Sequence, residues 1–179
     1  WINTLTAEQR PHATLPFGDD ERLKWHFFPQ VYRGLALADM TTAQRRSAHD
    51  LLRSALSAGG YLKATTVMLL ERILADMALA RGHKADHRDP ERYWFAIFGD
   101  PATTAPWGWR VQGHHLSLNF TLAGDSVVAT TPAFFGASPA EVREGPHSGL
   151  RVLGAEEDLG RELLASLDAD QHKQVMLSN

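Results

Sequence analysis

Two adjacent histidines, His114 and His115, are the residues of this sequence best suited to chemistry. Imidazole is a common metal ligand in proteins and exchanges protons near neutral pH. Alternation along a strand places the two rings on opposite faces, so both could hold one ion only if a bulge at Gly113 shifted the register. Two interpretations stay open. In the first, at least one ring has a metal-binding or catalytic role. In the second, one ring belongs to a hydrogen-bonded core histidine and the other lies on the surface.

Glu71 is the acid best placed to work with these histidines. It lies inside the most apolar stretch of a predicted helix, where a buried carboxyl group could act as a general base or a ligand. A structural acid held in a salt bridge is the alternative. His114, His115 and Glu71 are therefore the candidate catalytic residues, and the two histidines are the candidate metal ligands. Histidine ligands without cysteine suit zinc, iron, copper or manganese.

Substrate binding is predicted for polar and aromatic residues around the histidines: Trp107, Trp109, Arg110, Ser117 and Asn119. A single strand over 107–122 would turn its leucines to the core, and Ser117 and Asn119 to the same face as His115. The same register puts Arg110 and His114 on the apolar side. Arg110 could position an anionic group or form a structural salt bridge. The two tryptophans could line an aromatic pocket or belong to the core.

Composition excludes several classes of protein. The chain has 18 basic and 21 acidic residues and a net charge of −3, with no basic block of the kind that nucleic-acid binding needs. Disulfides, thiolate metal sites and a cysteine nucleophile are excluded because there is no cysteine. No apolar run reaches the length of a membrane span. Signatures of dinucleotide-binding, P-loop, α/β-hydrolase and zincin proteins are also missing.

The first 82 residues are expected to be helical. A recurring phrase marks predicted helix starts, with a side-chain oxygen followed three residues later by Gln or Glu, as in a capping box. It occurs at residues 6–9, 41–44, 138–141 and 168–171. Gly59 and Gly60 are expected to end the second helix. Residues 81–92 should form a charged loop, whose His83 and His87 have the i,i+4 spacing of a metal site but no helix to carry it.

Strands are predicted next, over 93–98, 107–122 and 126–131, with a hairpin turn at Gly124 and Asp125. Residues 132–136 should leave the sheet, and a helix is expected over 156–167. The order helices, strands, helices predicts an α+β fold: N-terminal helices, a central antiparallel hairpin or small sheet, and C-terminal helices. We expect one domain over 1–179, helical over 1–82, containing the sheet over 93–136 and helical again over 138–179.

Several phrases resemble one known family. They are Trp107-Gly-Trp-Arg110, the run from Gly113 to Thr121, Thr131-Pro-Ala-Phe-Phe-Gly-Ala137, Gly149-Leu-Arg151 and Glu156-Glu-Asp158. They are similar to the family catalogued as domain of unknown function 3500. The resemblance implies a longer family domain, whose later part carries an Asn-His-Ile-His phrase and an acidic tail. It also implies that a missing C-terminal part supplies further ligands beside His114 or His115. An extracytoplasmic location is slightly favoured.

The sequence therefore favours a metal-dependent enzyme domain, a hydrolase or an oxidoreductase, acting on a small molecule or peptide. One alternative is a non-catalytic binding module with an aromatic pocket for a small molecule or peptide. Another is a structural domain. Nucleic acid and membrane-spanning segments are not expected. The decisive observation is whether the rings of His114 and His115 converge on an open site.

Overall fold

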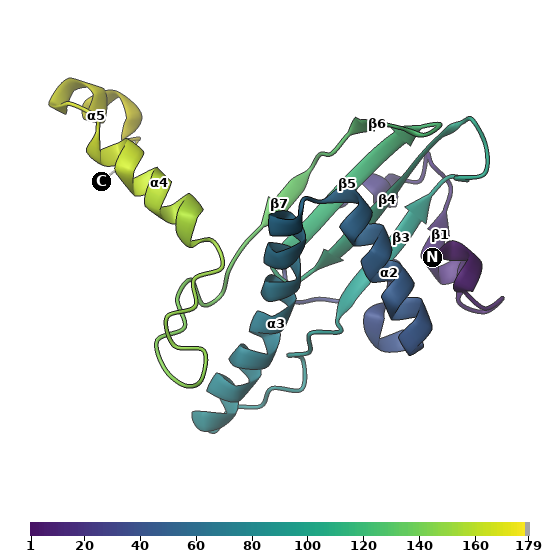
Figure 1. The fold of residues 1–179 in the computed structure, drawn as a ribbon, viewed down its shortest axis with the longest axis horizontal. Coiled ribbons are helices and arrows are strands. Elements are labelled where there is room, and N and C mark those ends of the chain that lie inside the picture. Colours follow the sequence, from purple (N-terminus) through teal and green to yellow (C-terminus); the bar gives the residue numbers. More distant parts are fainter. Residues whose placement is uncertain (178–179) are drawn as a thin grey trace. The chain divides into compact units, whose positions relative to one another are not determined.

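Three antiparallel strands form the centre of a mixed sheet: β3 (Tyr93–Phe98), β4 (Pro106–Gly113) and β5 (Leu116–Ala123). This sheet belongs to a computed structural model that describes residues 1–177 (Figure 1). The chain divides into two compact units, Trp1–Pro139 and Ala140–Asn179, and the sheet lies in the first. The expected α+β class is confirmed.

Short strands complete both edges of the sheet. On the outer edge of β3, β1 (Thr14–Leu15) pairs in parallel and β2 (Leu35–Ala36) pairs antiparallel. On the outer edge of β5, β6 (Ser126–Ala129) and β7 (Ala133–Phe135) each pair antiparallel. The hairpin of β5 and β6 confirms the predicted turn at residues 124–125. The expectation that residues 132–136 leave the sheet is wrong, because β7 returns to β5 beside the start of that strand.

All the helices of the first unit precede the three central strands in the chain. They are the 3-10 turns η1 (Ile2–Thr4), η2 (Asp20–Leu23) and η3 (Leu37–Asp39) and the α-helices α1 (Arg10–Ala13), α2 (Thr42–Ala55) and α3 (Ala58–Ala80). The capping box of Thr41 and Gln44 is present at the start of α2 as predicted. Gln44 also donates to the carbonyl of Thr4 at 2.8 Å, which ties the N-terminal segment to this helix.

The expectation that the first 82 residues are helical is wrong for residues 14–41. Residues 14–41 contain two short strands, two 3-10 turns and irregular backbone. This stretch contains Pro16, Gly18, Pro29 and Gly34, which interrupt regular helix. The glycines at 59 and 60 do not end a helix either. They lie in the first turn of α3, where Ser57 accepts a hydrogen bond from the amide of Gly60 at 3.1 Å.

The predicted strand over 107–122 is in fact two strands, β4 and β5, joined by a turn at residues 114–115. A two-residue turn changes which residues share a face, because Gln112 now pairs with Ser117 and Arg110 with Asn119. Arg110 therefore lies on the polar face and not on the apolar side. Trp109 joins the leucines of β5 on the apolar face, where its ring stacks on Phe120 at 4.3 Å.

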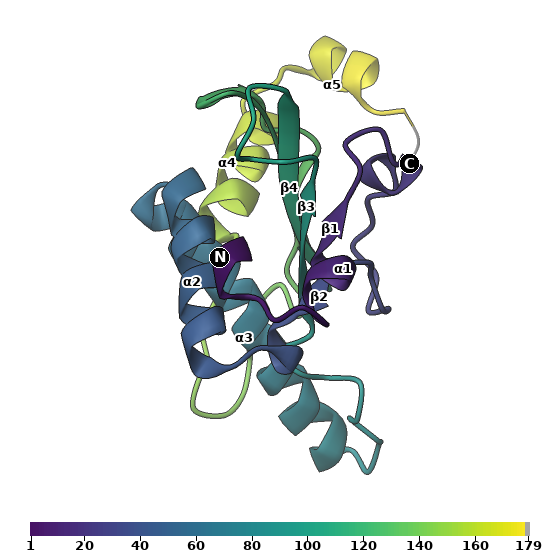
Figure 2. The ribbon, with the colours of Figure 1, turned by 90° about the vertical axis from the view of Figure 1, so that its right-hand side faces the viewer.

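Both faces of the sheet are covered. Seen nearly edge-on, the sheet has α2 and α3 on one side and the segment that joins β1 to β2 on the other (Figure 2). On the second side, Leu15 packs with Ala96 and Phe98, and Tyr32 packs with Trp94. The polar face of β4 and β5 is consequently buried instead of forming an open binding surface.

The second unit contains α4 (Gly154–Ala165) and α5 (Ala169–Val175). The capping box of Asp168 and Gln171 starts α5 as predicted, and the helix expected over 156–167 is α4. Arg151 pairs with Glu157 and Asp158 at 2.9 and 2.7 Å at the start of α4. The helix expected to start at residues 138–141 does not form. Within residues 1–177, no helix is both long and apolar enough to span a membrane.

Candidate functional site

His114 and His115 are the two residues of the turn between β4 and β5. Gly113 pairs with Leu116 directly before and after them. His115 has a φ of +58°, and it is the one non-glycine residue with positive φ within the described chain, residues 1–177. This left-handed conformation is unfavourable for an L-residue, so the surrounding structure must hold it in place. Strained residues of this kind are often found at functional sites.

Hydrogen bonds from three elements fix the turn. The hydroxyl of Tyr93 donates to the carbonyl of His114 at 2.8 Å. The amide of His115 donates to the carbonyl of Phe27 at 2.9 Å, and its carbonyl accepts from Gly136 at 2.8 Å. Gly113 is required by close packing, because a Cβ there would lie 2.3 Å from the Tyr93 ring. The backbone of the turn is therefore held by contacts with three other parts of the chain.

A buried carboxylate meets the ring of His114. Glu71, from α3, has 3% of its surface exposed, and its Oε1 contacts Nδ1 of His114. Arg88, from the loop after α3, lies with Nη1 at 3.4 Å from both Glu71 oxygens and 3.1 Å from Nδ1 of His114. The structure thus brings Glu71 and His114 together, and gives the acid a cationic partner as well.

The contact between Glu71 and Nδ1 of His114 bears on the tautomer of this ring. A carboxylate oxygen and an unprotonated ring nitrogen are both acceptors, so a proton must lie between Glu71 and Nδ1. With that hydrogen on Nδ1, the Nε2 lone pair is left to accept a proton or bind a metal ion. Catalytic and metal-binding histidines are commonly oriented by a carboxylate in this way.

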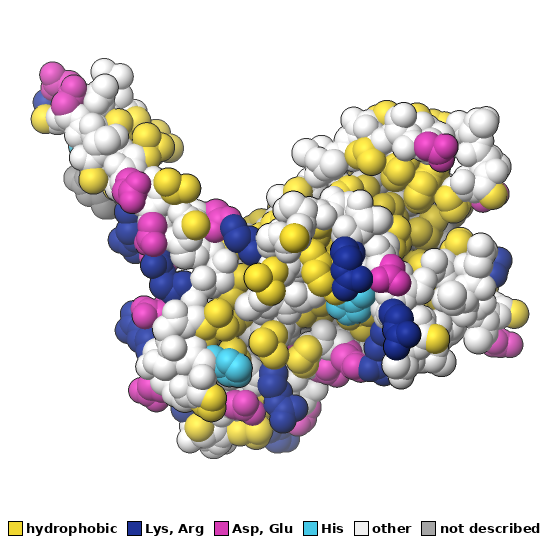
Figure 3. All heavy atoms as spheres, viewed as in Figure 1, with side chains coloured by type: hydrophobic (Ala, Val, Ile, Leu, Met, Phe, Trp, Pro, Cys, Tyr) yellow, Lys and Arg dark blue, Asp and Glu magenta, His cyan; other side chains and the backbone are white. Residues whose placement is uncertain are grey.

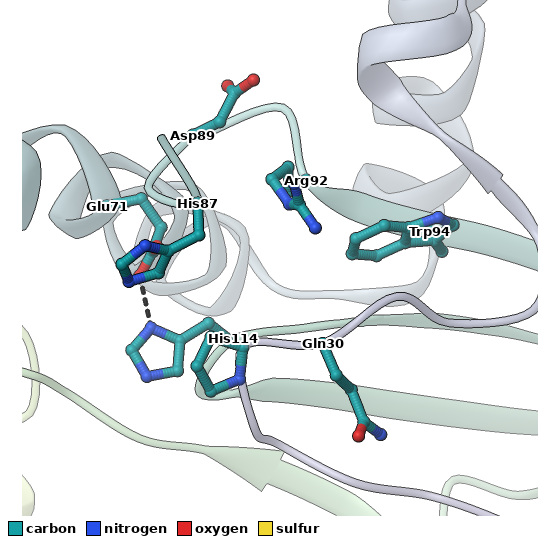
Figure 4. A pocket seen from close by; sticks show the side chains of 8 residues that line it. Gln30, Glu71, His87, Asp89, Arg92, Trp94 and His114 are labelled. Atoms are coloured by element: carbon teal, nitrogen blue, oxygen red, sulfur yellow. Dashed lines mark hydrogen bonds and ion pairs between the residues drawn. The ribbon is translucent and has the colours of Figure 1, made fainter. Parts of the chain in front are cut away.

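A small cavity lies beside this pair. Its volume is about 10 Å³, which is room for about one water molecule. Side chains from α3, the loop after it, β3, the turn and the 29–30 segment line it (Figure 4): Pro29, Gln30, Glu71, His87, Asp89, Arg92, Trp94 and His114. The lining thus combines charged groups of both signs with one oriented imidazole.

His115 differs from His114 in its surroundings. The two ring centroids are 4.1 Å apart, and Nδ1 of His115 is buried without a hydrogen-bond partner. Burial, together with the neighbouring His114, lowers the pKa of His115, so its ring is neutral at pH 7. The rings do not occupy opposite faces of a strand, because both belong to a turn. A neutral imidazole with a free nitrogen is competent to bind a metal ion.

Aromatic rings extend from His115 across the neighbouring loop. Phe27 stacks on Phe134 at 4.6 Å and lies 6.2 Å from His115, and Phe28 and Trp25 continue the series. Trp25 and Phe28 are exposed. This cluster, and not the tryptophans of β4, is the aromatic surface next to the histidines.

Arg110 is placed in a structural contact away from the histidine turn. Its side chain is 1% exposed, and Nη1 donates to the carbonyls of Glu21 and Lys24 at 2.9 and 3.1 Å. Nη2 donates to a carboxylate oxygen of Glu21 at 2.8 Å. The guanidinium therefore anchors η2 to the polar face of the sheet, which matches the salt-bridge alternative.

The other predicted substrate-binding residues also have internal partners. Ser117 donates to Gln112 at 3.0 Å, and Asn119 donates to Ser117 and to the carbonyl of Pro132 at 3.3 and 2.8 Å. The indole nitrogen of Trp107 donates to the carbonyl of Gly124 at 3.2 Å, and Trp109 packs in the core. None of the four lines the cavity beside His114, as far as residues 1–177 show.

Sequence reasoning missed several residues of the site. Arg88 lies in the charged loop predicted over residues 81–92, yet it contacts Glu71 and His114, which are 17 and 26 positions away in the chain. Of the two loop histidines, His87 lines the cavity and His83 does not. No local pattern signals these contacts, because a long loop brings them to the site. Among the described residues, no group of three or more His, Cys, Asp or Glu side chains is placed to hold a metal ion.

The fold and the site together define an α+β domain with a carboxylate–imidazole pair at a strained hairpin turn. The family model described as protein of unknown function (DUF3500) matches residues 1–179. The chain belongs to that family, and the resemblance seen in the sequence is confirmed. No match was found among curated proteins or among solved structures.

Proposed function

We propose that this chain is the domain of a hydrolytic enzyme in which His114 acts as the general base. The observation that carries the proposal is the contact of Glu71 with Nδ1 of His114, buried beside a cavity of single-water size. The cavity has room for a water molecule, which is one of the two reactants of a hydrolysis. Hydrolysis is therefore favoured over oxidation and reduction.

The residues around His114 have distinct roles in this reaction. Glu71 holds the ring through Nδ1, which leaves the Nε2 lone pair available, and Arg88 pairs with the carboxylate. Nε2 accepts a proton from water while the water oxygen forms a bond to the substrate's electrophilic centre. The same proton then passes to the leaving group as its bond breaks. The exposed rings of Trp25 and Phe28 would bind apolar parts of the substrate.

Chromogenic esters, amides, phosphates and glycosides provide the test. We expect the wild-type chain to hydrolyse one of these classes above background, and H114Q to reduce that rate by roughly 10²- to 10⁴-fold. H147Q is the matched control, since His147 is exposed in the second unit, and it should keep the full rate. Equal rates for wild type and a folded H114Q variant, or no hydrolysis of any class, would contradict the proposal.

A second candidate is a metal centre on the same turn. It is favoured by the buried, unpartnered Nδ1 of His115 next to the ring of His114. The two imidazoles would be the chain's ligands, and water or substrate would occupy the open positions of a zinc, iron, copper or manganese ion. Such an ion would lower the pKa of bound water and supply the nucleophile.

Metal analysis separates the two candidates. Protein purified without chelators would be measured by inductively coupled plasma mass spectrometry, beside the double variant H114A/H115A. About one equivalent of metal that is lost in the double variant supports the metal centre. Metal-free protein that still hydrolyses a substrate through His114 supports the general base alone.

A further inference from the structure

A second and larger cavity lies between α2 and α3, apart from the histidine turn. Its volume is about 270 Å³, close to the lower end of the range for small-molecule sites. Met68 and Leu69 of α3 and Pro90 of the following loop give it apolar walls, and α2 contributes Arg45 and His49. In the space-filling view of this face, a histidine lies between basic and apolar side chains over these helices (Figure 3).

The charge of Arg45 is already matched at this cavity. Its Nη1 forms an ion pair with Glu91, which also lines the cavity, and its Nε donates to the carbonyl of Met40 at 3.1 Å. An anionic ligand would meet the carboxylate of Glu91, and a cationic ligand would meet the guanidinium of Arg45. The cavity therefore favours a neutral ligand.

The ring of His49 has a hydrogen-bond partner at Nδ1. Arg53 donates to the phenol oxygen of Tyr61 at 3.3 Å, and this oxygen lies 3.1 Å from Nδ1 of His49, to which it can donate the phenol hydrogen. Burial and the charge of Arg53 lower the pKa of His49, so the ring is neutral near pH 7. A neutral ring that accepts at Nδ1 carries its hydrogen on Nε2. Tyr61, the partner of Nδ1, is not part of the cavity lining, so in this tautomer Nε2–H is the donor that remains for a ligand.

We propose that this cavity binds a small, neutral and mainly apolar molecule with one carbonyl group, which accepts a hydrogen bond from Nε2 of His49. The apolar walls bury the hydrocarbon part of the ligand, and the imidazole selects the acceptor. This site is independent of the hydrolytic function proposed above, because it shares no lining residue with the cavity beside His114.

Three probes of similar size test the proposal by ¹H–¹⁵N NMR titration. Acetophenone carries the neutral carbonyl, ethylbenzene lacks an acceptor and benzoate is anionic. We expect saturable shifts of amides in α2 and α3 with acetophenone. Ethylbenzene should bind roughly 2- to 10-fold more weakly, as one lost hydrogen bond predicts. Benzoate should bind most weakly of the three.

Variants locate the binding. H49F should weaken acetophenone roughly 2- to 10-fold without weakening ethylbenzene, because it removes the Nε2–H donor and keeps an aromatic ring in the cavity wall. L69W should weaken both probes by filling the cavity, and Leu69 is 40% exposed, so the fold should tolerate this change. R46Q is the matched control on the exposed side of α2 and should have no effect. Absence of saturable shifts with acetophenone overturns the proposal, as does ethylbenzene or benzoate binding as tightly as acetophenone.

Discussion

Glu71 is almost entirely removed from water, so its carboxylate depends on Arg88 and His114 for the interactions that solvent would otherwise supply. A double-mutant cycle with E71Q, H114Q and the double variant should therefore show strong coupling. We expect an interaction energy of about 1–3 kcal/mol in the free energy of unfolding, measured by urea denaturation. Each single variant should be destabilised, because it leaves a buried polar group without its partner.

An exposed ion pair calibrates that cycle. Arg53 and Asp50 are 3.0 Å apart on α2, with about 60% of each side chain exposed. Coupling between them should be only about 0–1 kcal/mol, as for surface pairs in general. A Glu71–His114 coupling no larger than this control would show that the contact does not hold the imidazole.

His115 allows the strain of the turn to be separated from the contacts of its ring. H115A and H115G both delete the imidazole, but only glycine adopts a φ of +58° without a steric penalty. H115G should therefore be more stable than H115A by about 1 kcal/mol, measured by thermal and urea unfolding. Equal stability of the two variants would mean that the backbone relaxes when the ring is removed.

The pairing of β4 with β5 explains why Arg110 acts on the fold and not on a ligand. Its buried guanidinium holds η2 through the side chain and carbonyl of Glu21 and the carbonyl of Lys24. R110M should cost about 3–5 kcal/mol, because Glu21 and two carbonyls lose their donor. R110K should recover little of this lost stability, because an ammonium group cannot reproduce the planar set of donors of the guanidinium.

Near-UV circular dichroism and urea unfolding would measure the effect of both variants. R22K is a control on the same 3-10 turn, because Arg22 donates to the carbonyl of Phe17 and is partly exposed. It should change stability by less than about 1 kcal/mol. An R110M variant of wild-type stability would contradict the structural role of Arg110.

Elements defined by local signals were predictable from the sequence. The capping boxes at Thr41 and Asp168 involve residues only three positions apart, and both helices start there. The strand at 93–98 is marked by its aromatic run. The path of residues 14–41 was not predictable, because its strands pair with β3, about 60 to 80 positions further along the chain.

The candidate site was predictable only in part. Residue type singled out His114, His115 and Glu71, and the structure places them around one turn. Strand alternation led to the wrong face for Arg110, because a two-residue turn without glycine or asparagine has no clear sequence signature. Arg88 reaches the site through tertiary contacts alone, so nothing in its neighbours predicted it.

At the scale of the whole molecule, buried titratable groups set the pH range of stability. Burial lowers the pKa of His49 and His115 and raises that of Tyr93. As pH falls below about 6.5, the unfolded chain binds protons at the histidines before the folded chain does, so stability decreases. Above about pH 10 the unfolded chain loses the tyrosine proton first, and stability decreases again. We therefore expect maximal stability at roughly pH 7–9.

Thermal unfolding between pH 5 and 8 tests the acid side of this profile. The double variant H49Q/H115Q should lose less stability than wild type on going from pH 7 to pH 5, because neither glutamine titrates. H147Q should follow the wild-type profile, because His147 is exposed and the substitution therefore removes no buried imidazole. A double variant with the same pH dependence as wild type would show that the two imidazoles are not held neutral by the fold.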